Sequence, residues 1–112
     1  MIQLGVLDQV HISEGQTAQE ALQESISLIR MAESLGYKRY WVSEHHSMPA
    51  LAFSSPEVFI AHLAAVTSKI RVGAGGIMLP HYSPYKVAEN FRLLEALHPH
   101  RIDLGLGRAP GG

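Results

Sequence analysis

Residues 70–106 read IRVGAGGIMLPHYSPYKVAENFRLLEALHPHRIDLGL and contain two predicted strands with a predicted helix between them. The apolar run 70–79 predicts the first strand, and Ser83-Pro84 supplies an N-cap and a first-turn proline for the helix. Residues 102–106 form the second apolar run. The helix is indicated by apolar side chains at helical spacing, which are Val87, Phe91, Leu94 and Leu97. A connection of this length joins parallel strands, so the stretch predicts a βαβ unit.

The same alternation extends toward the N-terminus. Residues 2–7 and 39–43 are short runs of β-forming side chains. Between them, residues 17–20 (TAQE) have the pattern of a capping box and begin an apolar periodicity that stops at Gly36. A further helix is predicted over residues 55–68. Strand and helix signals therefore alternate as β-α-β-α-β-α-β, which predicts an α/β fold with a parallel sheet.

Two parallel architectures fit this order, an open doubly wound sheet and a closed (β/α)8 barrel. An open sheet would be expected to carry a phosphate-binding loop after its first strand, but residues 8–16 contain no Walker motif. Residues 105–111 (GLGRAPG) place the last glycine one position too far for a dinucleotide fingerprint. We therefore predict that residues 1–112 form about the first half of a (β/α)8 barrel. Because such a half leaves two open sheet edges, we expect the chain to be part of a longer protein.

Composition narrows the classes of protein that the chain can be. Hydrophobic residues make up 46% and charged residues 17%, which excludes an intrinsically disordered chain. The formal net charge is −1, so no basic surface is expected to bind nucleic acid. The sequence has no cysteine, no apolar run near the roughly 20 residues that span a membrane, and no signal-peptide pattern at its start. These features predict a cytoplasmic domain without disulfides or thiolate metal sites.

Titratable side chains follow several predicted strands, where parallel α/β folds place their active sites. They are Asp8 after the first strand, Glu44, His45 and His46 after the second, and Arg108 after the fourth. In an extended chain, Glu44 and His46 share one face and His45 points to the other. This spacing is poor for a metal ion. Acid–base chemistry by an imidazole with a neighbouring carboxylate is favoured, and no metal ligand is assigned.

Glycines interrupt the third predicted strand. Residues 72–76 read VGAGG, and clustered glycines often mark a bulge or a close approach of the backbone to a ligand. The flat face of an aromatic cofactor would suit such a surface, although a packing contact is the alternative. Arg108, directly after Gly107, has the guanidinium geometry that binds phosphate oxygens. Together these positions predict a ligand site at one rim of the sheet.

Three motifs resemble those of bacterial luciferase-like flavin-dependent monooxygenases. They are WVSEHH at 41–46, GAGGIMLP at 73–80 and RIDLGLGR at 101–108, and they occur in the order found in that family. The resemblance covers the whole chain but only the N-terminal part of a typical member. It implies a (β/α)8 barrel that uses reduced FMN and O2, and that is usually a homodimer.

The same resemblance implies roles for individual residues. His45 matches the active-site histidine of the family, an acid–base or peroxyflavin-stabilising group, and Glu44 would help to shape the pocket. Gly75-Gly76 matches a bulge with a non-proline cis peptide bond beneath the isoalloxazine ring. Arg108 would contact the flavin phosphate, and Gly107 would lie near the reactive edge of the ring.

The resemblance also implies a reaction and its partners. Reduced FMN and O2 would oxidise a small organic, aldehyde-like substrate, and a separate flavin reductase would supply the reduced flavin; a deazaflavin is the nearest variant. Ser47-Met48-Pro49 stands where luminescent members carry an aromatic residue, which favours the non-luminescent, alkanal-monooxygenase-like branch. The histidine that some members carry after the third strand corresponds to Ser83 here, and His81 lies two residues earlier.

Three alternatives remain open from the sequence. The chain could be a flavin-binding module without turnover, which predicts binding of oxidised FMN without an oxygen-dependent product. It could be a metal-assisted hydrolase built on Glu44, His45 and His46, which predicts inactivation by chelators. It could also be a free-standing half-barrel that dimerises to rebuild eight strands.

Overall fold

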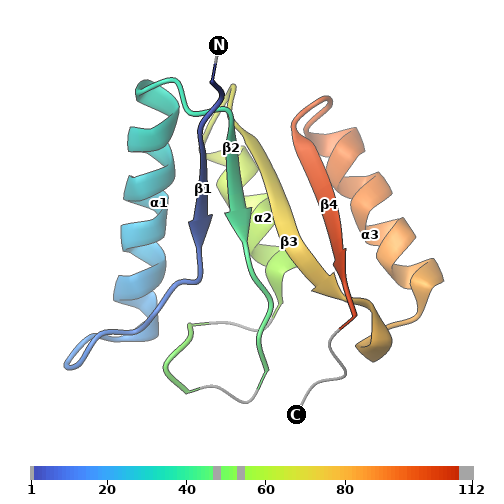
Figure 1. The fold of residues 1–112 in the computed structure, drawn as a ribbon, viewed down its shortest axis with the longest axis horizontal. Coiled ribbons are helices and arrows are strands. Elements are labelled where there is room, and N and C mark those ends of the chain that lie inside the picture. The colour runs from blue at the N-terminus through green and yellow to red at the C-terminus, as the bar shows by residue number, and fades with distance from the viewer. Residues whose placement is uncertain (1, 47–48, 53–54, 109–112) are drawn as a thin grey trace.

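The computed structural model describes residues 2–46, 49–52 and 55–108, and its centre is a four-stranded parallel sheet. The strands stand side by side in the order of the sequence (Figure 1). They are β1 (Gly5–Asp8), β2 (Arg39–Val42), β3 (Arg71–Met78) and β4 (Ile102–Gly107). All three neighbouring pairs are parallel. The predicted α/β class and strand order are confirmed.

Three helices connect the strands: α1 (Ala18–Ser34), α2 (Pro56–Ala65) and α3 (Pro84–Leu97). Figure 1 shows α1 beside β1, α3 beside β4 and α2 behind the sheet. Thr17 forms the expected capping box of α1: its hydroxyl accepts from the Glu20 amide at 3.1 Å, and the Glu20 carboxylate accepts from the Thr17 amide at 2.9 Å. None of the helices in the described residues is long and apolar enough to cross a membrane.

Some element boundaries differ from the prediction. The first strand was expected from residue 2, but β1 begins at Gly5, which pairs with Arg39 at the start of β2. The residues before Gly5 do not belong to the ladder of β1 with β2, and Ile2 is 85% exposed. The second predicted helix ends early, at Ala65, where the Thr67 hydroxyl donates to the Leu63 carbonyl at 2.7 Å.

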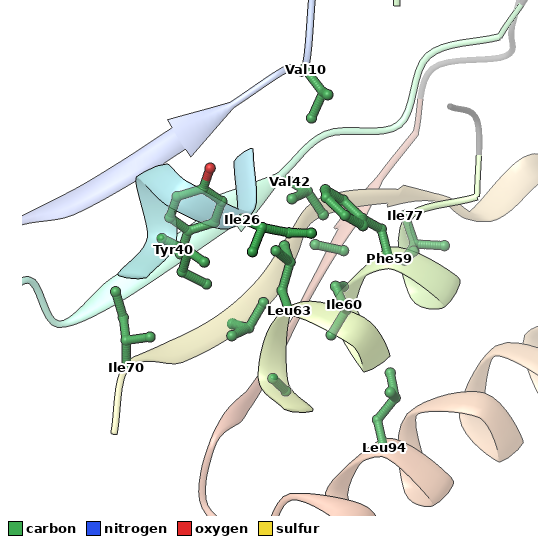
Figure 2. Packing of buried hydrophobic residues seen from close by; sticks show 14 of the residues in the cluster. Val10, Ile26, Tyr40, Val42, Phe59, Ile60, Leu63, Ile70, Ile77 and Leu94 are labelled. Carbon is green, nitrogen blue, oxygen red and sulfur yellow. The ribbon is translucent and has the colours of Figure 1, made fainter. Parts of the chain in front are cut away.

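The core lies between the sheet and the helices. Alternate residues of β2 and of the first half of β3 point toward the helices and are fully buried. Figure 2 shows Tyr40 and Val42 among helix side chains such as Ile26, Ile60 and Leu63. Apolar side chains on one side of each helix therefore pack against apolar side chains at every second position of the strands. This packing holds the helices on one face of the sheet.

The opposite face of the sheet carries Trp41 and an ion-paired cluster. Asp103 on β4 accepts hydrogen bonds from Arg71 on β3, with Nη2 at 2.8 Å, and from Arg39 on β2, with Nε at 3.2 Å. A side chain at Gly73 would clash here, because its Cβ would lie 2.6 Å from the Asp103 carbonyl oxygen. The cluster therefore ties three strands together near their amino ends.

Candidate active site at the carboxyl ends of the strands

The carboxyl ends of β2, β3 and β4 lie at one edge of the sheet, because the strands are parallel and adjacent (Figure 1). The residues after β2 are Ser43 to His46, those after β3 form the short helix η1 (Leu79–His81), and Arg108 follows β4. The strand predicted over residues 70–79 begins at Arg71 and ends at Met78, and Leu79 belongs to η1 instead. The predicted site residues lie at this rim or in the glycine bulge just before it; they are Glu44, His45, Gly75, Gly76, Gly107 and Arg108.

Glu44 is the most deeply buried charged residue at this rim. The residue is 1% exposed. Its Oε1 accepts from the Met78 amide at 3.0 Å, and its Oε2 accepts from the Tyr82 hydroxyl at 2.6 Å and interacts with His46 Nε2. A buried carboxylate is stable only when hydrogen-bond donors surround it. Here His46 follows β2, whereas Met78 ends β3 and Tyr82 lies in the turn after it. Glu44 therefore joins the ends of the two strands.

The partner of Glu44 is His46 rather than His45. This agrees with the alternation of side chains predicted from the sequence, which placed Glu44 and His46 on one face. The His46 ring also faces His81 of η1, with ring centroids 4.9 Å apart and planes tilted by 40°. His45 is half-buried, and sequence alternation places it on the other face of the chain.

Gly75 and Gly76 form an irregularity in β3. The register of β3 with β4 shifts between Ala74 and Ile77. The Gly75–Gly76 peptide bond is cis, as the resemblance to the luciferase-like family implied. Gly75 is exposed, and the atoms nearest to a Cβ there would belong to the Trp41 side chain, the closest being a ring carbon at 3.3 Å. The backbone at Gly75 thus presents a surface without a side chain beside an indole ring. Such a surface fits the planar ring of a flavin.

Two further features of the rim fit a bound cofactor. The Ser43 hydroxyl, directly before Glu44, is buried and has no hydrogen-bond partner in the described part of the chain. Arg108 is exposed directly after β4, and Gly107 pairs with Met78. An exposed guanidinium at the end of a barrel strand suits a phosphate.

Comparison with known proteins agrees with this architecture. The family model described as luciferase-like monooxygenase matches residues 2–112. The chain belongs to the luciferase-like monooxygenase family. It is 66% identical over its whole length to the uncharacterised protein YwcH of Bacillus subtilis, and 58% identical to the N-acetyl-S-alkylcysteine monooxygenase of the same organism. In both cases it spans 34% of the relative, so it covers about a third of their length.

Solved structures of luciferase-like monooxygenases and related proteins have the same fold. Apo-MsnO8 superposes with a TM-score of 0.94 at 54% identity, over 97% of this chain and 33% of that one. The oxygenating constituent of 3,6-diketocamphane monooxygenase from Pseudomonas putida, a type II Baeyer–Villiger monooxygenase in complex with FMN, gives 0.89 at 27% identity, over 100% of this chain and 30% of that one. The predicted (β/α)8-barrel class, with this chain as its first four strands and three helices, is confirmed.

Asp8 differs from the rim residues with which the sequence grouped it. Its carboxylate accepts from the Ser25 hydroxyl at 2.6 Å, from the Val10 amide at 2.9 Å and from the Tyr40 hydroxyl. Burial, and next the hydrogen bond to Asp8, raise the pKa of the Tyr40 phenol. Asp8 therefore joins β1 to α1 and β2 in the helix layer and is occupied by structural contacts.

The described residues hold no group of three or more His, Asp or Glu side chains placed to bind a metal ion. The Glu44 oxygens are already bound by Met78, Tyr82 and His46. The tripeptide Ser47-Met48-Pro49, which favoured the non-luminescent branch, falls at residues 47–48 outside the described part of the chain. The same holds for the last glycine of the 105–111 fingerprint.

Sequence reasoning missed Tyr82. The residue lies in a turn after the predicted strand, and it has no partner at a spacing that a motif search would detect. Its contact with Glu44 spans 38 positions along the chain. A signal did exist, because a buried carboxylate after β2 needs donors from a neighbouring element, and the turn after β3 is the adjacent segment.

Proposed function

We propose that this chain is the N-terminal part of a flavin-dependent monooxygenase that uses reduced FMN and O2 to oxidise a small organic substrate. The observation that carries the proposal is the side-chain-free surface at Gly75, which lies beside Trp41 near the rim where Glu44, His45 and His46 follow β2. Membership of the luciferase-like monooxygenase family supports the same assignment. A deazaflavin is the alternative cofactor.

The residues proposed to hold the flavin are those implied by the family resemblance, and their place at one rim supports the assignment. Gly75 and Gly76 would lie against the isoalloxazine ring, Gly107 near its edge, and Arg108 on the phosphate. When bound, the reduced flavin supplies the two electrons that activate O2. The FMN complex of the 27% identical Baeyer–Villiger monooxygenase supports FMN as the cofactor.

His45 is the proposed proton-transfer residue of this reaction. An imidazole can accept or donate a proton near neutral pH, and His45 follows β2 at the rim of the sheet. Glu44 would act from the other side of the backbone, where its bonds to Met78 and Tyr82 keep the ends of β2 and β3 at a fixed separation. The chain would thus position the reacting groups while the cofactor provides the redox chemistry.

The proposed substrate is a small, aldehyde-like or related organic molecule. The Pseudomonas neighbour is described as a Baeyer–Villiger monooxygenase, and the 58% identical relative as acting on an N-acetyl-S-alkylcysteine. One oxygen atom is inserted into a bond of the carbonyl carbon in a Baeyer–Villiger reaction, and one oxygen atom can be added to a thioether sulfur. Both classes of substrate therefore belong in the first assays. In each case the second oxygen atom leaves as water, with the electrons coming from the reduced flavin.

The proposed partners are a flavin reductase and a second copy of the chain. The Pseudomonas neighbour is described as an oxygenating constituent, which supports a separate component that supplies reduced flavin. Cytoplasmic location is part of the proposal, since the sequence contains no cysteine and such a chain suits a reducing compartment. Light scattering in solution would measure the mass and test the homodimer.

The experiment uses the full-length protein that contains residues 1–112. It is saturated with reduced FMN under nitrogen and mixed with O2 in the presence of an aldehyde or an alkyl thioether, and oxygen uptake and product are measured. A flavin-dependent, substrate-dependent oxygenated product supports the proposal. Binding of oxidised FMN with no such product would indicate a binding module, whereas chelator-sensitive hydrolysis without flavin would indicate the metal-assisted alternative.

A further inference from the structure

The turn after β3 carries a side chain that the proposed function does not use. Tyr82 lies one residue after η1 and donates a 2.6 Å hydrogen bond to Glu44 Oε2. Burial, and next the hydrogen bond to Glu44, raise the pKa of the Tyr82 phenol well above its usual range. Tyr82 is therefore a neutral hydrogen-bond donor throughout the pH range in which enzymes of this kind work.

The hydrogen-bonding capacity of Glu44 fixes the state of its neighbour. An ionised carboxylate only accepts, so each of its three partners must donate. The Met78 amide and the Tyr82 hydroxyl do so at 3.0 Å and 2.6 Å. His46 must then present Nε2–H to Glu44 Oε2, and a neutral His46 keeps an unprotonated Nδ1 that can accept a proton.

We propose that Tyr82 is a positioning residue that acts through Glu44 to hold His46 in its Nε2–H tautomer, with Nδ1 unprotonated in the neutral imidazole. The Tyr82 hydroxyl and His46 Nε2 bind the same carboxylate oxygen. The rotation of that carboxylate is fixed at its other oxygen by Met78. The His81 ring packs against His46 and limits the rotation of the imidazole. The catalytic consequence rests on the proposed monooxygenase function, whereas the tautomer does not.

Loss of the Tyr82 hydroxyl has a predictable effect on this arrangement. Without the Tyr82 hydroxyl, Glu44 Oε2 has one hydrogen-bond donor fewer. The carboxylate can then rotate while its Oε1 stays hydrogen-bonded to the Met78 amide. The orientation of His46 then loosens, and its neutral form divides between the two tautomers. Glu44→Gln has a sharper effect, because the amide can offer an N–H to Nε2 and so favour the Nδ1–H form.

The first test is nitrogen NMR of histidine-labelled protein without flavin, at a pH where imidazoles are neutral. The full-length protein is used, and a His46→Gln spectrum assigns the His46 signals by difference. We expect Nε2–H in the parent protein, a mixture in Tyr82→Phe, and Nδ1–H in Glu44→Gln. Tyr85→Phe is the matched control, because Tyr85 is 73% exposed and should leave the tautomer unchanged.

An Nδ1–H signal for His46 in the parent protein would overturn the inference, and so would a Tyr82→Phe spectrum identical to that of the parent. If Tyr82→Phe does not fold, the parent protein and Glu44→Gln still decide the matter. A merely structural role for Tyr82 would lower the midpoint of unfolding and leave the tautomer unchanged.

The second test measures turnover in the full-length protein. Because Tyr82 and Met78 hold Glu44, the residue directly before His45, we expect loss of the Tyr82 hydroxyl to misplace the end of β2. Tyr82→Phe should lower kcat about tenfold with little change in KM. Tyr85→Phe should retain the parent kcat. An unchanged kcat in a Tyr82→Phe protein with a mixed tautomer would overturn the catalytic part. A complete lack of flavin binding in the parent protein would instead count against the proposed function, and the tautomer result would stand by itself.

Discussion

Gly76 of β3 lies so close to Gly105 of β4 that a Cβ on Gly76 would come within 3.0 Å of the Gly105 carbonyl carbon and oxygen. Both contacts are to backbone, which cannot move without opening the sheet. Its neighbour Gly75 is different, because the atoms nearest to a Cβ there would belong to the Trp41 side chain rather than to backbone. The two adjacent glycines thus serve different purposes. Gly76 allows β3 and β4 to pack closely, and Gly75 leaves the face of the sheet that carries Trp41 open.

This difference predicts opposite outcomes for two matched variants. Gly76→Ala should lower the free energy of unfolding by about 1–3 kcal/mol, because the new methyl group overpacks the β3–β4 contact. Gly75→Ala should change it by less and should instead weaken the binding of FMN. Urea unfolding and flavin fluorescence titration measure the two effects. Equal loss of stability in both variants, with equal loss of FMN binding, would contradict the division of roles.

The ion-paired cluster at the amino ends of the strands should contribute measurably to stability. Asp103→Ala leaves Arg39 and Arg71 without their shared carboxylate, and the Asp103 side chain is only 18% exposed. We expect a loss of about 2–3 kcal/mol in urea unfolding, somewhat below the cost for a fully buried pair. Lys86→Ala, which removes the exposed pair with Glu89, is the control and should cost less than about 0.5 kcal/mol. A loss no larger than that of the control would show that the cluster is not stabilising.

Stability should fall at alkaline pH as Tyr40 ionises. The folded protein raises the pKa of Tyr40, so the neutral phenol is favoured in the fold, and this contribution is complete below the ordinary tyrosine value of about 10. It should be lost as pH rises above that value. Tyrosinate absorbance followed together with circular dichroism should show Tyr40 ionising as the chain unfolds. Tyr40→Phe should remove that part of the absorbance change; ionisation of Tyr40 well before unfolding would contradict the account.

The free energy of unfolding should also depend on pH in acid, because of Glu33. Its Oε2 accepts from the amides of Ser68, Lys69 and Ile70 at 2.9, 2.6 and 3.0 Å, which anchors the start of β3 to the end of α1. Burial opposes ionisation, but hydrogen bonds from these amides outweigh it and lower the pKa of Glu33. The stabilisation should therefore be present above pH 4.5 and be lost as pH falls below it.

Glu33→Gln tests this prediction. It should cost about 1 kcal/mol at neutral pH, a modest value because the carboxylate is largely solvated. Below pH 4.5, the stability of the variant should also depend less on pH than the stability of the parent protein does. Parallel acid-unfolding curves for the two proteins would contradict it.

Much of the fold could be predicted because local and long-range signals agree. The capping box at Thr17, the proline after Ser83 and the stop at Gly36 mark helix ends by local chemistry, and the structure has α1 and α3 at those places. The start of β1 could not be predicted, because Ile2 and Leu4 have strand-forming side chains but no neighbouring strand along their full length. Ladder partners are not visible in local sequence.

The site was partly predictable for the same reason. Parallel strands bring their carboxyl ends together, so the sequence could group Glu44, Gly75 and Arg108 at one rim. It could not tell that Asp8 turns to Ser25 and Tyr40, or that Tyr82 reaches Glu44, because both depend on which face of a neighbouring element a side chain meets.

The most direct test of the central claim is the rate at which reduced FMN is reoxidised by O2 when the full-length protein is present in excess. The account predicts that bound reduced FMN reoxidises more slowly than free FMN, because the rim around Gly75 and His45 controls access to the ring. His45→Ala should bind reduced FMN and change this rate. Reoxidation at the rate of free FMN in the parent protein, with no protein-bound flavin, would contradict the assignment of this rim as a flavin site.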